Sequence, residues 1–224
     1  MKDSRSRVLY LMLILFLSSW SLLFSRAIFA RPPEGTVQGK VTLLGKSRVP
    51  GIKLSEVVVS IEDFTYANPS AEAKNVAATN GAVLNQKDMN FSPRILPVLA
   101  GTEVSFRNDD KVFHNIRSKS PAYPFNFGQI SSSKAANVRK VKFDKPGVVP
   151  IDCDVHSEMH AFILVKPNPF FALADEKGQF TLKNVPPGKY KLQAWHEKFE
   201  PVVKEITFSE GQLTTVELNL DKKK

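Results

Sequence analysis

The chain has 224 residues, of which 42% are hydrophobic, and it carries 31 Lys and Arg against 22 Asp and Glu. That hydrophobic share is enough for a packed core and argues against wholesale disorder, and the length allows one large or two small domains. The formal charge of +9 is spread along the chain, with Lys222 to Lys224 as its run of bases. No helix-turn-helix, zinc-finger or aromatic RNA-binding pattern accompanies this charge, so we expect no nucleic-acid partner.

Residues 1–30 have the composition of a targeting segment. Three basic residues precede an apolar run from Val8 to Phe24 that only serines interrupt. Small residues after the run offer cleavage sites, and the run is slightly short for a membrane span. We therefore expect either a cleaved signal peptide or a retained membrane anchor. Either one exports the rest of the chain to a periplasmic or other extracytoplasmic compartment, and an anchor would be its contact with the membrane.

The first expected strands follow a short Pro-rich linker. Residues 36–43 alternate between apolar and polar, which is typical of a half-buried strand. Residues 57–61 form a short apolar run, which is typical of a more buried strand. Residues 66–80 are rich in Ala, Asn and Ser without any period, so we expect a connecting loop there.

A second set of expected strands runs from about residue 82 to residue 166. Val149, Ile151 and Cys153 share one strand face by the period of two, so the Cys153 thiol is expected to point into a core. After the next loop, alternate residues again share a face, with Met159, Ala161, Ile163 and Val165 on one side and His160, Phe162 and Leu164 on the other.

A third set of short strands begins at Phe170. These strands alternate in the same way and are separated by turns at Gly178, at residues 186–188 and at Gly211. No helical period of 3.6 persists for a dozen residues after residue 30. The exported chain is therefore expected to be all-β.

The stretch from Asp152 to Met159 contains the single cysteine of the chain. A thiolate, an imidazole and a thioether follow one another there as Cys-x2-His-x2-Met. A single cysteine in an oxidising compartment has no disulfide partner, so it is either an inert buried thiol or a metal ligand. A further histidine, His114, comes just after the strand expected to end at Asn108. Two imidazoles, one thiolate and a weak axial thioether are the ligands of a mononuclear blue-copper site.

On these residues, the segment 82–166 resembles the cupredoxins, the plastocyanin family, and its ligand spacing is similar to that of the short-loop member amicyanin. The resemblance implies a Greek-key β-sandwich with one copper ion per chain, cycling between Cu²⁺ and Cu⁺. It implies His114, Cys153 and His156 as equatorial ligands and Met159 as the axial ligand. Asn115 resembles the family's residue whose hydrogen bonds tie the two ligand loops together.

The flanking segments resemble a second family. The turn and the Pro-Pro-Gly motif within residues 174–192 are similar to those of the carboxypeptidase regulatory-like, transthyretin-like domain. The Gly-x-Val-x-Gly-x-Val pattern with which that family usually starts matches residues 35–41. We predict a small Ig/transthyretin-like sandwich split into residues 36–66 and 168–221, with the cupredoxin domain, residues 82–166, inserted between its second and third strands. Phe162 and Leu164 are then expected to pack against this host sandwich.

These expectations describe an exported blue-copper protein that passes single electrons between redox proteins and is not an enzyme. Three other interpretations stay open: copper binding or delivery without electron transfer, an enzyme with a red-copper-like site, and a structural sandwich with a relic site. His156 is expected to be the ligand nearest solvent, with Phe113 and Pro124 as part of a docking patch. His160 is expected to point away from the site, and His196 to be a structural or interface residue.

Overall fold

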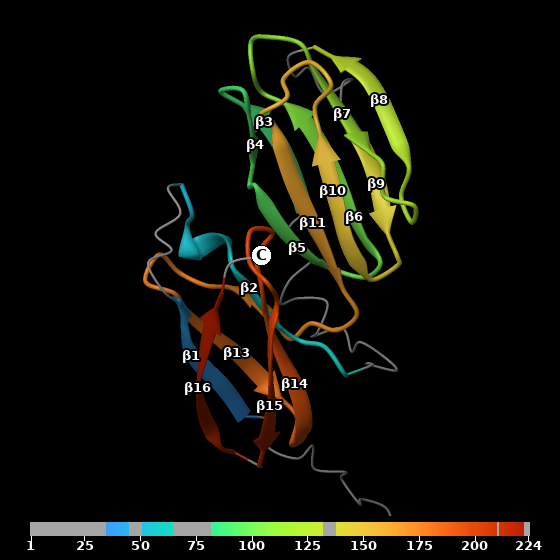
Figure 1. Ribbon diagram of the computed structural model, residues 1–224. Coiled ribbons are helices and arrows are strands. Elements are labelled where there is room, and N and C mark those ends of the chain that lie inside the picture. The colour runs from blue at the N-terminus through green and yellow to red at the C-terminus, as the bar shows by residue number, and fades with distance from the viewer. Residues whose placement is uncertain (1–34, 45–50, 65–81, 132–137, 210, 222–224) are drawn as a thin grey trace, which may run out of the picture. The chain divides into compact units, whose positions relative to one another are not determined.

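The computed structural model describes residues 35–44, 51–64, 82–131, 138–209 and 211–221, all within one compact unit. The expected signal or anchor and the expected loop at residues 66–80 lie outside these residues. The described part is all-β, as predicted, with sixteen strands in four sheets and one short 3-10 helix, η1 (Leu54–Glu56) (Figure 1). None of its helices is long and apolar enough to cross a membrane.

Two of the sheets combine strands from the beginning and the end of the described chain. Their strand orders are β13-β1-β16 and β12-β2-β14-β15. The strands are β1 (Gly35–Leu43), β2 (Val58–Ile61), β12 (Phe171–Leu173), β13 (Gln179–Val185), β14 (Gly188–Trp195), β15 (Val202–Phe208) and β16 (Leu213–Leu220). Alternating apolar residues of both sheets meet in one core that includes Val37, Val59 and Leu192. We call this pair of sheets the host sandwich, after the predicted insertion of residues 82–166.

Close packing against neighbouring strands explains why glycines occupy two positions at the start of the host sandwich. A Cβ atom on Gly39 would lie 1.9 Å from the carbonyl oxygen of Val216 on the neighbouring strand. A Cβ atom on Gly35 would lie 1.8 Å from the ring of Phe208. The Gly-x-Val-x-Gly pattern therefore marks the positions where β1 lies too close to other strands for any side chain.

The other two sheets form a second sandwich, called here the copper sandwich after the metal site that the sequence predicts in it. Their strand orders are β4-β3-β6-β9 and β5-β11-β10-β7-β8. The strands are β3 (Ala82–Lys87), β4 (Asn90–Ser92), β5 (Ile95–Leu99), β6 (Thr102–Asn108), β7 (His114–Ser118), β8 (Phe125–Ile130), β9 (Arg139–Phe143), β10 (Gly147–Asp152) and β11 (His160–Lys166). Figure 1 shows the β3–β4, β6–β7 and β10–β11 connections together at one end of it.

The inner faces of the copper sandwich follow the period of two expected from the sequence. Val149, Ile151 and Cys153 are all buried, and so are Met159, just before β11, and the alternate residues Ala161, Ile163 and Val165 on it. The core is completed by aromatic packing, with the ring centroid of Phe106 5.6 Å from that of Phe125. The Cys153 side chain therefore lies in an apolar core, as predicted.

A third apolar cluster lies between strands of the two sandwiches. Leu164 and Ile95, from β11 and β5, pack there with Val58 and Trp195, from β2 and β14. The ring centroids of Phe162 and Trp195 are 5.7 Å apart. The outward face of β11 is thus covered by strands of the host sandwich, as the prediction for Phe162 and Leu164 requires.

Candidate metal centre

The Cys-x2-His-x2-Met stretch forms the loop between β10 and β11. Two backbone hydrogen bonds close this loop: the N–H of Cys153 donates to the carbonyl oxygen of Met159 at 3.2 Å, and the N–H of Met159 donates to that of His156 at 3.0 Å. Both ends of the loop are continuous with paired strands. The spacing of the motif therefore folds the chain back so that its three potential ligands lie at one edge of the core.

Three of the four predicted ligands are brought together. The Nδ1 atoms of His114 and His156 lie 3.1 Å apart, and the Sγ of Cys153 lies 3.9 Å from Nδ1 of His156. Among the described residues, these three side chains form a group whose donor atoms all lie within 4.8 Å of one another. Metal–nitrogen and metal–sulfur bonds of about 2.0 and 2.3 Å allow one ion to reach all three atoms. A thiolate with two imidazoles is a donor set that fits copper.

The His114 side of the site is held by the loop between β6 and β7. Asn108, fully buried, donates from Nδ2 to the carbonyl oxygens of Val112, at 2.9 Å, and Ile130, at 2.8 Å. Its Oδ1 accepts the N–H of Asp110 at 2.9 Å. One buried amide therefore fixes the path of the chain just before the histidine, which is itself fully buried.

Asp110 contacts His114 directly. Its Oδ2 lies 2.9 Å from Nε2 of the imidazole and also accepts the N–H of Met89 at 2.8 Å. Its Oδ1 accepts the N–H of Lys111 at 2.8 Å. Together the Met89, His114 and Lys111 hydrogen bonds hold the pKa of Asp110 at about 2. Sequence reasoning missed this residue, although a carboxylate four positions before a candidate ligand histidine is a usable signal.

Asn115 connects the two ligand loops through its backbone. Its N–H donates to Sγ of Cys153 at 3.5 Å, whereas its side-chain Nδ2 donates to Oδ1 of Asn126 on β8 at 2.7 Å. A second connection is the ion pair between Arg117 on β7 and Asp154 in the ligand loop. The contact with the cysteine sulfur therefore comes from a main-chain group, which no side-chain pattern could indicate.

Met159 is buried in the same core cluster as Cys153. His160 is half-buried, and its ring lies 6.4 Å from that of Phe162, outside the donor group. His196 is buried in the host sandwich, where burial lowers its pKa. Pro124 lies away from His114, because the next residue, Phe125, pairs with Ser118 at the other end of β7. Its part in a docking patch stays a prediction.

Comparisons with known proteins address both sandwiches. The family model of the carboxypeptidase regulatory-like domain matches residues 164–221, which confirms that predicted resemblance. No sequence of a curated protein matches the chain. The matched residues include the strands from β12 to β16.

Solved structures similar to the chain include cupredoxins. A reduced Cu(I) form of an amicyanin mutant shares 17% identity and a TM-score of 0.36, covering 48% of this chain and 98% of amicyanin. A purple cupredoxin from Nitrosopumilus maritimus shares 24% identity and a TM-score of 0.33, covering 38% and 99%. A copper-containing nitrite reductase from Thermus scotoductus shares 22% identity and a TM-score of 0.35, and the match covers 38% of this chain and 22% of the reductase.

Proposed function

We propose that the protein is an exported blue-copper electron carrier. The observation that carries this proposal is the convergence of His114 Nδ1, Cys153 Sγ and His156 Nδ1 within 4.8 Å at the end of a β-sandwich. Met159, buried at the far end of the same loop, is the axial ligand in this proposal. When bound, copper supplies one-electron chemistry between Cu⁺ and Cu²⁺ at such a site.

The surrounding residues suit this role because they hold the ligands in place and keep water away from them. His114 and Cys153 are buried, and hydrogen bonds from Asn108 and Asn115 restrain the loops that carry them. Ligands that are already fixed need to move little when the oxidation state changes, which favours fast electron transfer. His156 is half-buried and is therefore the proposed exit for the electron.

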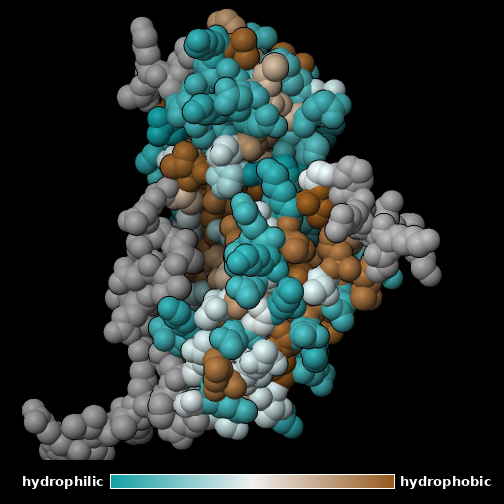
Figure 2. Space-filling view, turned by 90° about the vertical axis from the view of Figure 1, so that its left-hand side faces the viewer, coloured by the Kyte–Doolittle hydropathy of each residue, from teal (hydrophilic) through white to brown (hydrophobic). Residues whose placement is uncertain are grey.

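The same end of the copper sandwich is the proposed docking surface for a redox protein. Large exposed apolar side chains lie in the three connections there, and Figure 2 shows hydrophobic atoms at this tip among hydrophilic ones. These side chains are Met89, Val112, Phe113 and Val155. Six of the eight acidic residues in the range 82–166 also lie in or beside these connections: Asp88, Asp109, Asp110, Asp152, Asp154 and Glu158. Although the chain as a whole is basic, the charge at this end favours a basic partner.

We further propose that the copper sandwich is a domain inserted into the regulatory-like domain. The pairing of β1 and β2 with strands from β12 to β16 supports this division. The segments that leave and re-enter the host sandwich are fixed to each other. Lys166 forms a 2.8 Å ion pair with Glu62, and Asn168 donates to the carbonyl oxygen of Ile61 at 2.8 Å. In this arrangement the host sandwich positions the electron carrier.

Copper loading followed by absorption spectroscopy and voltammetry tests the proposed function. An intense visible band from thiolate-to-copper charge transfer and a reversible one-electron wave are expected. Cys153→Ala should abolish both, whereas His160→Ala, which changes a histidine outside the donor group, should leave both unchanged. A copper complex without the visible band, or one that cannot be reduced reversibly, would contradict an electron carrier.

A further inference from the structure

The imidazole of His114 is held between two partners on opposite sides of its ring. Nδ1 faces His156 and the donor group, at 3.1 Å from Nδ1 of that residue. Nε2 faces Asp110, at 2.9 Å from Oδ2 of the carboxylate. Since the His114 side chain is fully buried and Asp110 is only 14% exposed, this hydrogen bond has little competition from water. A carboxylate can only accept here, so the geometry favours the tautomer with its proton on Nε2.

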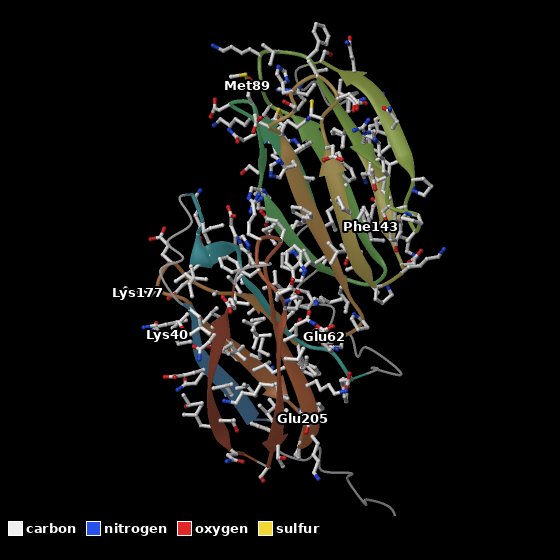
Figure 3. The ribbon with its side chains drawn as sticks, viewed as in Figure 1. Lys40, Glu62, Met89, Phe143, Lys177 and Glu205 are labelled. Carbon is white, nitrogen blue, oxygen red and sulfur yellow. The ribbon has the colours of Figure 1, made fainter. Side chains whose placement is uncertain are left out.

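The position of the carboxylate is itself fixed by main-chain groups from two loops. Oδ2 accepts the N–H of Met89, at the tip of the β3–β4 turn, and Oδ1 accepts the N–H of Lys111. Asp88 and Met89 have φ angles of 51° and 55°, a left-handed turn conformation that costs free energy in residues other than glycine. Figure 3 shows Met89 at the same end of the copper sandwich as the β10–β11 loop. Because backbone groups hold it, the carboxylate cannot easily turn away from the imidazole.

We propose that Asp110 is a positioning residue that fixes the tautomer of the ligand His114 and sets the balance between Cu²⁺ and Cu⁺ at the site. By accepting the Nε2 proton, it leaves the lone pair of Nδ1 free for the metal. It also places a negative charge behind the ligand, which stabilises the more highly charged ion. This inference deepens the proposed function and rests on His114 as a copper ligand.

Asp110→Asn tests the proposal, because it keeps the shape of the side chain but removes its charge. In the metal-free protein, ¹⁵N NMR of the histidine rings should show His114 protonated on Nε2 in the wild type and a changed or averaged tautomer in the variant. Affinity for Cu²⁺ should fall about 10- to 100-fold, as is typical when such a partner of a ligand histidine is lost. Affinity for Cu⁺ should fall less. A tenfold difference between the two losses corresponds to a rise of about 59 mV in the reduction potential.

Asp109→Asn is the matched control, since it removes the same charge from the neighbouring residue. The Asp109 carboxylate accepts hydrogen bonds from Asn85 and Arg107. It should leave the tautomer unchanged and move the potential much less. Asp110→Glu should recover part of the wild-type affinity. Wild-type tautomer and affinity in Asp110→Asn, or an equal shift in Asp109→Asn, would overturn the inference. The NMR and affinity measurements need no electron-transfer partner, so they can succeed even if the carrier function fails.

Discussion

Arg94 forms the main ion-pair contact between the two sandwiches, and its loss should be costly. Its Nε and Nη2 atoms lie 2.9 and 2.6 Å from Oε2 of Glu56, and Nη2 lies 2.8 Å from Oε2 of Glu197. Arg94 precedes β5 of the copper sandwich, whereas both carboxylates belong to the host sandwich. Arg94→Met keeps most of the apolar stem but leaves two carboxylates unpaired beside the buried His196.

The expected loss in the free energy of unfolding is about 2–3 kcal/mol. Removing one partner of a fully buried ion pair costs about 3–5 kcal/mol, and exposed pairs contribute about 0–1 kcal/mol. The Arg94 side chain is 25% exposed and the two glutamates are 15% and 10% exposed, so the site lies between these limits and nearer to the buried one.

The loss should also depend on pH. Burial acts to raise the pKa of Glu197, but the hydrogen bond from Arg94, together with the charges of His196 and Arg94, outweighs it and lowers that pKa. In the wild type, Glu197 therefore contributes stability above its ordinary pKa, and this is lost as the pH falls through the lowered value. Without Arg94, burial should raise the pKa of Glu197. As the pH falls, protonation of Glu197 then removes the free-energy cost of burying its unpaired charge. The difference between the two proteins should be largest near pH 7 and shrink towards pH 4.

Urea unfolding of the wild type and the variant at several pH values measures this difference. Arg107→Met is the matched control, because its 3.1 Å pair with Asp109 has side chains 45% and 33% exposed. The control should lose less than about 1 kcal/mol and show little dependence on pH. An Arg94→Met variant as stable as this control at pH 7, or one destabilised more at pH 4 than at pH 7, would refute the reasoning.

Three further predictions concern the ligand loop, the contact between the sandwiches and the partner. Met159→Leu should change stability by less than about 1.5 kcal/mol but shift the reduction potential; an unchanged potential would remove Met159 from the ligands. Leu164→Ala should cost about 2–5 kcal/mol in urea unfolding with an unaltered copper spectrum, and a near-neutral effect would contradict its burial among host strands. Added salt should slow electron transfer to a basic redox protein, and Glu158→Gln should weaken that dependence. A rate that rises with salt would show that the two proteins repel each other and would contradict an acidic docking surface.

The sequence determined the features that depend on neighbours along the chain. The period of two placed Cys153, Met159 and Leu164 on their correct strand faces, because successive side chains in a strand point to opposite sides. The same rule turned His160 away from the donor group. The all-β class followed from short alternating segments separated by turn residues. These features are local, so a single sequence contains the information for them.

The tertiary structure decided which distant groups meet. The register of β7 with β8 moved Pro124 away from His114, and no local pattern encodes that register. The contacts of the Asn115 N–H with the Cys153 sulfur and of the Asp110 carboxylate with the Met89 N–H arise where separate loops converge. A main-chain N–H is present at almost every residue, so its partner depends on where the fold places it. The candidate ligands can thus be read from the sequence, whereas the groups that hold them depend on how the strands pack.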